Sequence, residues 1–243
     1  MELAGRVALV TGAGHRLGRA IAVALGERRM RVAVHANQSV AGAEETVRMI
    51  AAAGGEAAVF QGDLRDAAAA ADLPRRVASR FGGLDVLVNA AGVMIEATVA
   101  ATTPALWDDV MAVNLRAAFF TAQGAAPLLK AARGKVVNLA DVGGLEPWPR
   151  YVAHCISKAG VVMLTQTLAR ALAPEVTVNA VAPGAVLPPD DWGEEAREHL
   201  ARTTPLRRLG SPADVTAAIL YLLEGGDFVT GETIVVDGGR LIR

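Results

Sequence analysis

Three features of the sequence predict an α/β fold with a doubly wound, seven-stranded parallel sheet and helices on both faces. Short apolar runs typical of buried strands alternate with segments of helical periodicity along the whole chain. A glycine-rich turn follows the first strand, and further glycine or polar motifs follow later strands. No low-complexity linker divides the 243 residues, so we predict a single domain over residues 1–243.

Composition narrows the classes of function. With 52% hydrophobic residues, 20% charged residues and a net charge of -1, the chain lacks the basic excess of nucleic-acid-binding proteins. It has no apolar run of the ~18 residues that a membrane span needs, and its first residues lack the regions of a signal peptide, so we expect a cytoplasmic protein. The single cysteine excludes an internal disulfide, and the four histidines lack metal-ligand spacing, so no metal is expected.

The chain begins with a strand, a turn and a helix that together predict a phosphate site. Residues 7–10 are apolar throughout, as in a strand buried on both faces, and helical periodicity begins near Leu17. The turn between them contains Gly12, Gly14 and Gly18. Glycine lets the backbone approach a ligand closely, and the free amides and positive dipole at a helix start attract anions.

The same alternation predicts six more strands. They are expected at residues 32–35, 57–61, 86–88, 135–139, 177–181 and 233–236. Helical segments separate them, so the crossovers are right-handed, and the ligand site lies beyond the carboxyl ends of the strands. Residues 183–193 form a long irregular stretch, so we expect a substrate lid around residues 185–210.

Glycine and capping residues mark the ends of the helices. Glycine pairs are expected to end two helices, one over residues 43–53 and one just before Gly82. Thr103 and Pro104 predict the N-cap and the first position of a long helical segment. Further helices are expected over residues 152–171 and from Ser211 onward.

The turn after the first strand does not fit the common dinucleotide fingerprint G-x-G-x-x-G, because position 17 is Leu17. It does fit T-G-x-x-x-G-x-G through Thr11, Gly12 and Gly18, with Arg16 in place of the middle glycine. This turn resembles that of the short-chain dehydrogenase/reductase family, which has a Rossmann fold. Arg16 resembles the pteridine-reductase branch of that family.

Further blocks resemble the same family in the expected order over essentially the whole chain. Asp63 and Leu64 resemble the pair that meets the adenine ring, and the stretch from Asn89 through Ala91 resembles the family's N-N-A-G block. Asn114 resembles the helix asparagine that holds a proton-relay water. Residues 179–184 and 229–239 resemble blocks of the C-terminal half.

The family's catalytic set is a Ser after the fifth strand, a Tyr thirteen residues later and a Lys four beyond that. The matching positions here are Asp141, His154 and Lys158. The i, i+4 spacing puts His154 and Lys158 on one helix face. The resemblance implies that Lys158 holds the nicotinamide ribose and favours proton transfer. Asp141 matches the pteridine-reductase branch, whereas His154 departs from both patterns.

Three interpretations of His154 stay open, because the family's Tyr protonates the carbonyl or imine as hydride arrives. In the first, protonated His154 donates the proton, since the free pKa of histidine is about 6.5 and Asp141 favours the cation while Lys158 opposes it. In the second, Tyr151, one helical turn earlier, substitutes. In the third, the chemistry has been lost and a nucleotide-binding shell remains.

The end of the second strand favours NADPH over NADH. NAD-specific members have an acidic residue there that binds the ribose hydroxyl, and the matching residue is Ala36. The residues expected around a 2′-phosphate are His15, Arg16, His35 and Ser39. The full set that the resemblance implies for the cofactor is Gly12, His15, Arg16, Leu17, Gly18, His35, Ser39, Asp63, Leu64, Asn89, Ala91, Lys158, Pro183 and Gly184.

These features predict an oxidoreductase that transfers a hydride between NADP(H) and a small carbonyl or imine substrate, such as a pterin. The alternative is a catalytically impaired NADP(H)-binding homologue that acts as a sensor or silent subunit. Where the pteridine-reductase branch stacks a pterin on an aromatic ring, this chain has Val-Met-Ile at residues 93–95. Trp148 and Trp192 are expected either to supply aromatic surface to the cleft or to lie at a subunit contact. The resemblance implies a homotetramer or a homodimer.

Overall fold

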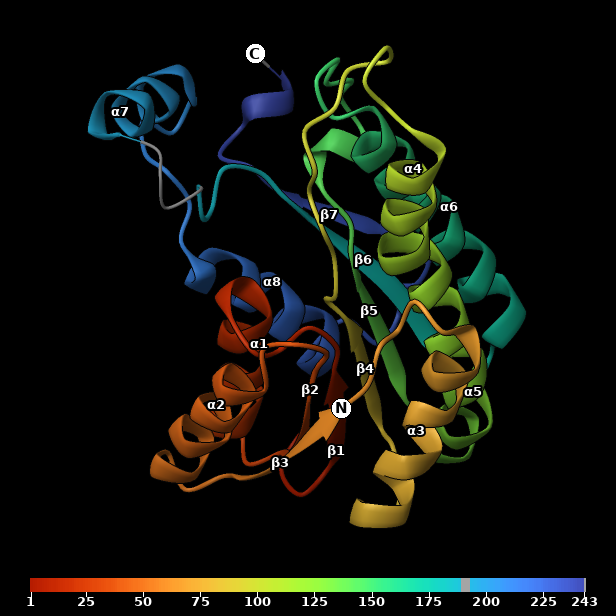
Figure 1. Ribbon diagram of the computed structural model, residues 1–243. Coiled ribbons are helices and arrows are strands. Elements are labelled where there is room, and N and C mark those ends of the chain that lie inside the picture. The colour runs from red at the N-terminus through yellow and green to blue at the C-terminus, as the bar shows by residue number, and fades with distance from the viewer. Residues whose placement is uncertain (189–192, 243) are drawn as a thin grey trace.

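The computed structural model describes residues 1–188 and 193–242, and it confirms the predicted fold (Figure 1). Seven strands form one sheet in the order β3-β2-β1-β4-β5-β6-β7, and every neighbouring pair is parallel. The strands are β1 (Val7–Val10), β2 (Arg31–Ala36), β3 (Glu56–Gln61), β4 (Val86–Asn89), β5 (Lys135–Leu139), β6 (Thr177–Pro183) and β7 (Thr233–Val236). The order reverses between β1 and β4, the point at which parallel sheets bind ligands.

The helices confirm the predicted capping signals. Thr103 Oγ1 accepts a hydrogen bond from the Leu106 amide over 3.2 Å, and Ser211 forms a capping box with Asp214. Gly82 ends its helix with a φ of 85°. The α-helices are α1 (Arg16–Glu27), α2 (Val40–Ala52), α3 (Ala67–Phe81), α4 (Pro104–Met111), α5 (Ala117–Ala132), α6 (Val152–Leu172), α7 (Glu194–Thr203) and α8 (Pro212–Glu224). Shorter turns are the π-helical η1 (Ala112–Arg116) and the 3-10 turns η2 (Val142–Gly144) and η3 (Arg240–Ile242).

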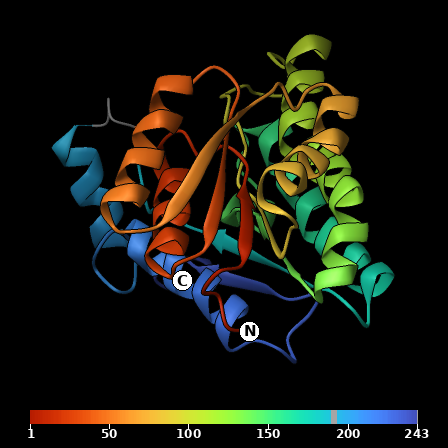
Figure 2. The same cartoon turned by 90° about the horizontal axis from the view of Figure 1, so that it is seen from below.

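Two helix layers enclose the sheet. Helices α1, α2 and α8 cover one face, and α3, α5 and α6 cover the other; Figure 2 shows the twisted sheet between them. The strand side chains alternate between the two layers, so that Val10 packs with the first and Leu9 with the second. Burying a side chain such as Leu9 stabilises the fold by roughly 1.5–3 kcal/mol. Because both faces are covered, the strands are continuous apolar runs.

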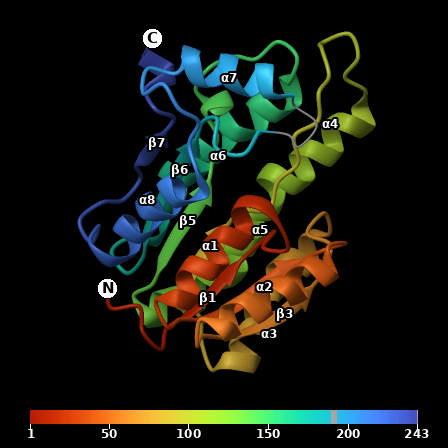
Figure 3. The same ribbon diagram turned by 90° about the vertical axis from the view of Figure 1, so that its left-hand side faces the viewer.

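The segment predicted as a substrate lid contains α7. Residues 189–192, including Trp192, lie outside the described part of the chain. Helix α7 has no buried residue and stands beyond the carboxyl end of the sheet (Figure 3). Among the helices of the described residues, none is long and apolar enough to cross a membrane.

Candidate active site

The turn after β1 is packed so closely that it requires glycine. Gly12 has a φ of 66°, and a Cβ there would lie 2.7 Å from the backbone of the loop after β4. A Cβ on Gly18 would lie 2.2 Å from the carbonyl oxygen of Gly12. The chain therefore follows one tight path from β1 into the start of α1.

The start of α1 presents the positive end of its helix dipole to a cavity of about 810 Å³. Its N-cap residue, His15, makes no side-chain hydrogen bond to the first-turn amides, and no acidic residue lies in that turn. Arg16 and Leu17, at the first two helical positions, line the cavity. Backbone amides, a helix dipole and a guanidinium fit the phosphates of a dinucleotide.

His35 lies beneath the turn, and this corrects the expectation that it meets a 2′-phosphate. Its Nδ1 accepts a hydrogen bond from the Gly12 amide over 3.2 Å, and its Nε2 donates to the Gly62 carbonyl over 3.0 Å. Burial lowers the pKa of His35 to about 4, so the ring is neutral near pH 7. With both ring nitrogens engaged by backbone, His35 supports the turn from below.

The other residues implied to bind a cofactor fall into three groups. Those that line the cavity are Arg16, Leu17, Lys158, Pro183 and Gly184. Outside its lining, near the same edge of the sheet, are His15, Ser39, Asp63 and Leu64. Asn89 is buried in the sheet, where its Nδ2 donates to Asn138 Oδ1 over 2.9 Å. The Ala91 amide donates to Thr11 Oγ1 over 3.0 Å, which ties the loop after β4 to β1.

Asp141, His154 and Lys158 come together at one end of this cavity. Asp141 follows β5, and the other two lie on α6, where His154 Nε2 is 3.8 Å from Asp141 Oδ1. Lys158 Nζ donates to the Leu139 carbonyl over 2.7 Å. Burial lowers the pKa of Lys158, and the negative charge of Asp141 partly opposes that shift.

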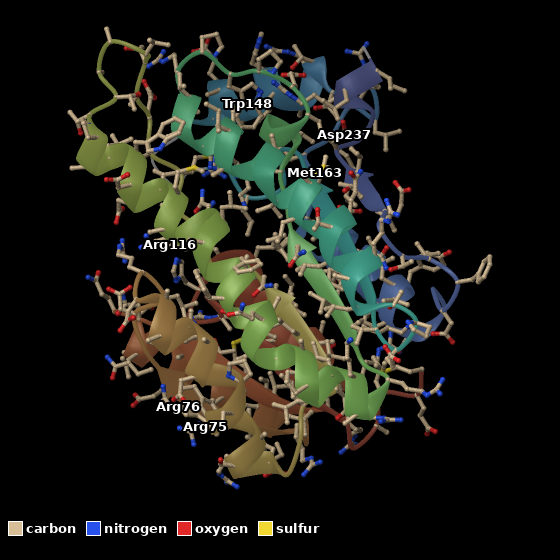
Figure 4. All side chains as sticks on the ribbon, turned by 90° about the vertical axis from the view of Figure 1, so that its right-hand side faces the viewer. Arg75, Arg76, Arg116, Trp148, Met163 and Asp237 are labelled. Carbon is tan, nitrogen blue, oxygen red and sulfur yellow. The ribbon has the colours of Figure 1, made fainter. Side chains whose placement is uncertain are left out.

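The His154 ring is held in one orientation. Its Nδ1 lies 3.2 Å from the Val93 carbonyl oxygen, which can only accept, so Nδ1 carries a hydrogen. Its Nε2 is buried and has no hydrogen-bond partner among residues 1–188 and 193–242. The Trp148 ring is nearly parallel to the imidazole, at 6° with centroids 6.3 Å apart, and Figure 4 shows Trp148 near the start of α6. The unpartnered nitrogen therefore faces Asp141.

Asn114 clamps the loop that holds His154. Its Oδ1 accepts from the Val93 amide over 2.7 Å, and its Nδ2 donates to the Val93 carbonyl over 2.9 Å and to Ser157 Oγ over 3.0 Å. Its side chain thus joins the loop after β4 to α6, and the relay-water role that the resemblance implies for Asn114 stays a prediction. Sequence analysis did not identify Val93 as a site residue. It acts through its backbone amide and carbonyl, which every residue type except proline has, so the sequence does not mark the position.

Tyr151 lines the same cavity, and its hydroxyl is engaged by another lining residue. Its hydroxyl donates to Glu96 Oε2 over 3.2 Å, and Glu96 also pairs with Arg150. The Tyr151 and Trp148 rings meet edge to face, with centroids 6.2 Å apart. Together they form an aromatic wall of the cavity. Residues 93–95, where the pteridine-reductase branch has its aromatic ring, are Val-Met-Ile and contribute none.

Comparison with known proteins places this geometry in a family. A family model described as enoyl-(acyl carrier protein) reductase matches residues 12–240. A variant of a Serratia marcescens short-chain dehydrogenase/reductase superposes with a TM-score of 0.92 at 31% identity, covering 99% of both chains. The chain belongs to the short-chain dehydrogenase/reductase family. It is thereby a member of an oxidoreductase family.

Two further members show the range of named activities among similar proteins. The 3-oxoacyl-(acyl-carrier-protein) reductase FabG of Staphylococcus aureus is 37% identical over 237 residues, 96% of each chain. The structure of FolM alternative dihydrofolate reductase 1 from Brucella canis, complexed with NADP, has a TM-score of 0.93 at 33% identity and covers 100% of this chain and 96% of its own.

Proposed function

We propose that this short-chain dehydrogenase/reductase is an NADPH-dependent reductase of a small carbonyl or imine, with a pterin-like ring as the favoured substrate. The observation that carries the proposal is the unpartnered Nε2 of His154, 3.8 Å from Asp141 Oδ1 and close to the buried Lys158. This ring lines the same cavity as the start of α1. A proton source and a dinucleotide cradle are what a carbonyl or imine reduction needs.

The residues at the cofactor end support NADPH. NADPH, when bound, supplies the hydride. Arg16 offers a charge to a 2′-phosphate, and Ala36 leaves no carboxylate at the end of β2 to repel one. Lys158 is buried and lines the cavity, and the family resemblance implies that it holds the nicotinamide ribose. The NADP in the Brucella canis structure supports the same choice.

The substrate end supports a planar ring. Trp148 and Tyr151 form one wall of the cavity, and aromatic walls favour flat ligands. Arg16 and Asp141 match the pteridine-reductase branch, and the Brucella canis relative is named as a dihydrofolate reductase. The volume of about 810 Å³ also admits longer 3-oxoacyl groups, in keeping with the name of the FabG relative.

The test is NADPH oxidation over a panel of pterins, quinones, diketones and 3-oxoacyl thioesters, with wild type and His154→Tyr measured side by side. We expect wild-type turnover, with pterins fastest, that the Tyr variant does not exceed. A silent wild type beside an active Tyr variant would contradict the proposal that His154 supports catalysis.

A second candidate function is nucleotide binding without chemistry. It is favoured by the burial of His154 Nε2, which leaves no exposed acid at the position of the family's Tyr. It predicts that NADPH at 100 times its Kd stabilises the fold by ~2.7 kcal/mol while no member of the panel is reduced.

We also propose self-association through α5 and α6, as the family resemblance implies. Phe119, Ile156 and Met163 expose 39%, 45% and 60% of their surface on these helices, and Figure 4 shows Met163 on the outer side of α6. Large exposed apolar side chains on adjacent helices favour a second copy as occupant. Met163→Glu is expected to shift the sedimentation coefficient toward the monomer.

A further inference from the structure

The turn after β7 brings an arginine to the cavity from the far edge of the sheet. Arg240 lies on η3, which follows β7, and it lines the cavity together with Leu200 of α7. In the strand order, β7 and β3 are at opposite edges of the sheet. The phosphates and the adenine ribose of a dinucleotide lie beyond β1 and β2 in this type of fold. Arg240 is therefore on the substrate side of the cavity.

The turn that carries Arg240 is closely packed. Asp237 Oδ1 accepts a hydrogen bond from the Gly239 amide over 2.7 Å, and its Oδ2 accepts one from the Leu241 amide over 2.8 Å. Figure 4 shows Asp237 where the chain leaves β7. Gly238 and Gly239 have left-handed φ values of 67° and 88°, and a Cβ on Gly238 would lie 2.7 Å from the threonine side chain that follows α7. Packing thus fixes the backbone from which the Arg240 side chain extends.

The charges that line the cavity favour an anion. Among the described residues, the cationic lining side chains are Arg16, Arg150, Lys158 and Arg240, and the acidic ones are Glu96 and Asp141. Arg150 Nε donates to Glu96 Oε1 over 2.8 Å, and the charge of Asp141 acts on Lys158. Arg16 lies at the phosphate end, at the start of α1. Within this set, Arg240 is the residue that makes the substrate side net positive.

The cavity also has apolar lining residues in the segments that follow β6. These are Val186 and Leu187 after β6, and Leu200 on α7. A charged hydrogen bond is stronger beside apolar walls than in bulk water, because the effective dielectric constant is lower there. The planar guanidinium of arginine matches the paired oxygens of a carboxylate or a phosphate. This side of the cavity therefore fits a ligand with an apolar body and an anionic group.

We infer that Arg240 binds an anionic group of the substrate, a carboxylate or a phosphate at a distance from the carbon that accepts the hydride. The inference rests on the proposed reductase function and narrows its substrate class. A folate-type pterin carries carboxylates on its side chain, and a 3-oxoacyl thioester of phosphopantetheine carries a phosphate on its thiol arm. Arg240 is then a specificity-determining residue that takes no part in the transfer of hydride or proton.

The first test is independent of turnover and uses two matched pairs of ligands. Calorimetry on protein saturated with NADP⁺ compares folate with its dimethyl ester, and the butyryl thioester of phosphopantetheine with that of pantetheine. In at least one pair, wild type should bind the anionic member about tenfold more tightly or better. Arg240→Gln should abolish this preference, and Arg240→Lys should keep part of it. Arg207→Gln, which removes an exposed arginine of the segment after α7, should keep all of it.

The pair that shows the preference identifies the anion, a carboxylate in the first pair and a phosphate in the second. Two results overturn the inference. One is that wild type shows no preference for the anionic member of either pair, whether it binds both members equally or neither. The other is a preference that persists in Arg240→Gln.

The second test asks which kinetic constant depends on Arg240. The substrates are dihydrofolate and its dimethyl ester, and the 3-oxobutyryl thioesters of phosphopantetheine and pantetheine. Arg240→Gln should raise the KM of the anionic substrate about tenfold and leave its kcat near that of wild type, because the arginine binds the ground state and the transition state alike. The neutral partner should be unaffected. An equal loss of kcat on both members of a pair would place Arg240 at the reacting centre and contradict the inference. A wild type that reduces no substrate counts against the proposed function alone, and the calorimetry then decides this inference.

Discussion

The imidazole of His35 accepts a hydrogen bond from the Gly12 amide over 3.2 Å, joining the end of β2 to the turn that follows β1. The other ring nitrogen donates to Gly62, after β3. One buried side chain thus fixes the turn against two neighbouring strands. Because its ring must stay neutral to accept from Gly12, the shape of the turn depends on pH.

Stability is expected to fall in mild acid because of His35. The pKa of His35 is about 4 in the folded protein and 6.5 unfolded, so the unfolded chain binds more protons between these values. The contribution is fully present above pH 6.5, is lost as pH falls toward 4, and is worth roughly 3 kcal/mol. In urea unfolding from pH 4 to pH 7, the free energy of unfolding of His35→Gln should rise less steeply with pH than that of wild type. The exposed His199→Gln should follow wild type, and equal slopes in all three would contradict the account.

Gly12→Ala should damage both the fold and nucleotide binding. A left-handed φ of 66° costs a non-glycine residue about 1–2 kcal/mol, and the added Cβ would lie 2.7 Å from backbone. We expect a loss of about 2–4 kcal/mol in urea unfolding. Gly83→Ala is the matched control, because its Cβ would meet nothing within 4 Å. Equal stabilities would show that the turn tolerates a side chain.

Arg16→Ala should weaken NADPH binding and spare NADH. A charged hydrogen bond to a phosphate is worth about 1.5–3 kcal/mol, so we expect the Kd for NADPH to rise at least tenfold. Arg133→Ala removes an exposed arginine with the same φ of 49°, and calorimetry should find its NADPH affinity unchanged. If Arg16→Ala loses NADH affinity as well, the arginine binds the pyrophosphate that NADH and NADPH have in common and not the 2′-phosphate.

The charge of Lys158 should depend on Asp141. Burial lowers the pKa of Lys158, and the Asp141 carboxylate partly offsets this, so Asp141→Asn should lower that pKa further. Lys158 then loses its proton at a lower pH than in wild type. NMR titration of ¹⁵N-labelled lysine is practical because the chain has three lysines, Lys130, Lys135 and Lys158. Lys130 is the control, and an unchanged Lys158 titration would contradict the coupling.

The sequence predicted those parts of the fold that leave a repeating signal. Strands buried on both faces are unbroken apolar runs, and capping at Thr103 and Ser211 needs particular side chains. Helix α7 left no such signal, because none of its residues is buried and its sequence is mostly charged and polar. Element type was therefore predictable wherever burial imposed a pattern.

The site was predictable only in part, for a similar reason. Spacing places His154 and Lys158 on one face of α6, and both line the cavity with Asp141. Which way the imidazole turns depends on the backbone carbonyl of Val93, which any residue type would supply. His35 has the residue type of a phosphate ligand, and only burial shows that both its nitrogens bind backbone.

The most direct test of the account is hydride transfer itself. NADPH in which deuterium replaces both hydrogens on the reactive ring carbon is incubated with the protein and each member of the carbonyl and imine panel, and the masses of the products are measured by mass spectrometry. We predict one deuterium in each molecule of reduced product from wild type, and none from Lys158→Met. Unlabelled or absent product from wild type, with NADPH bound, would contradict the reductase and leave a nucleotide-binding protein.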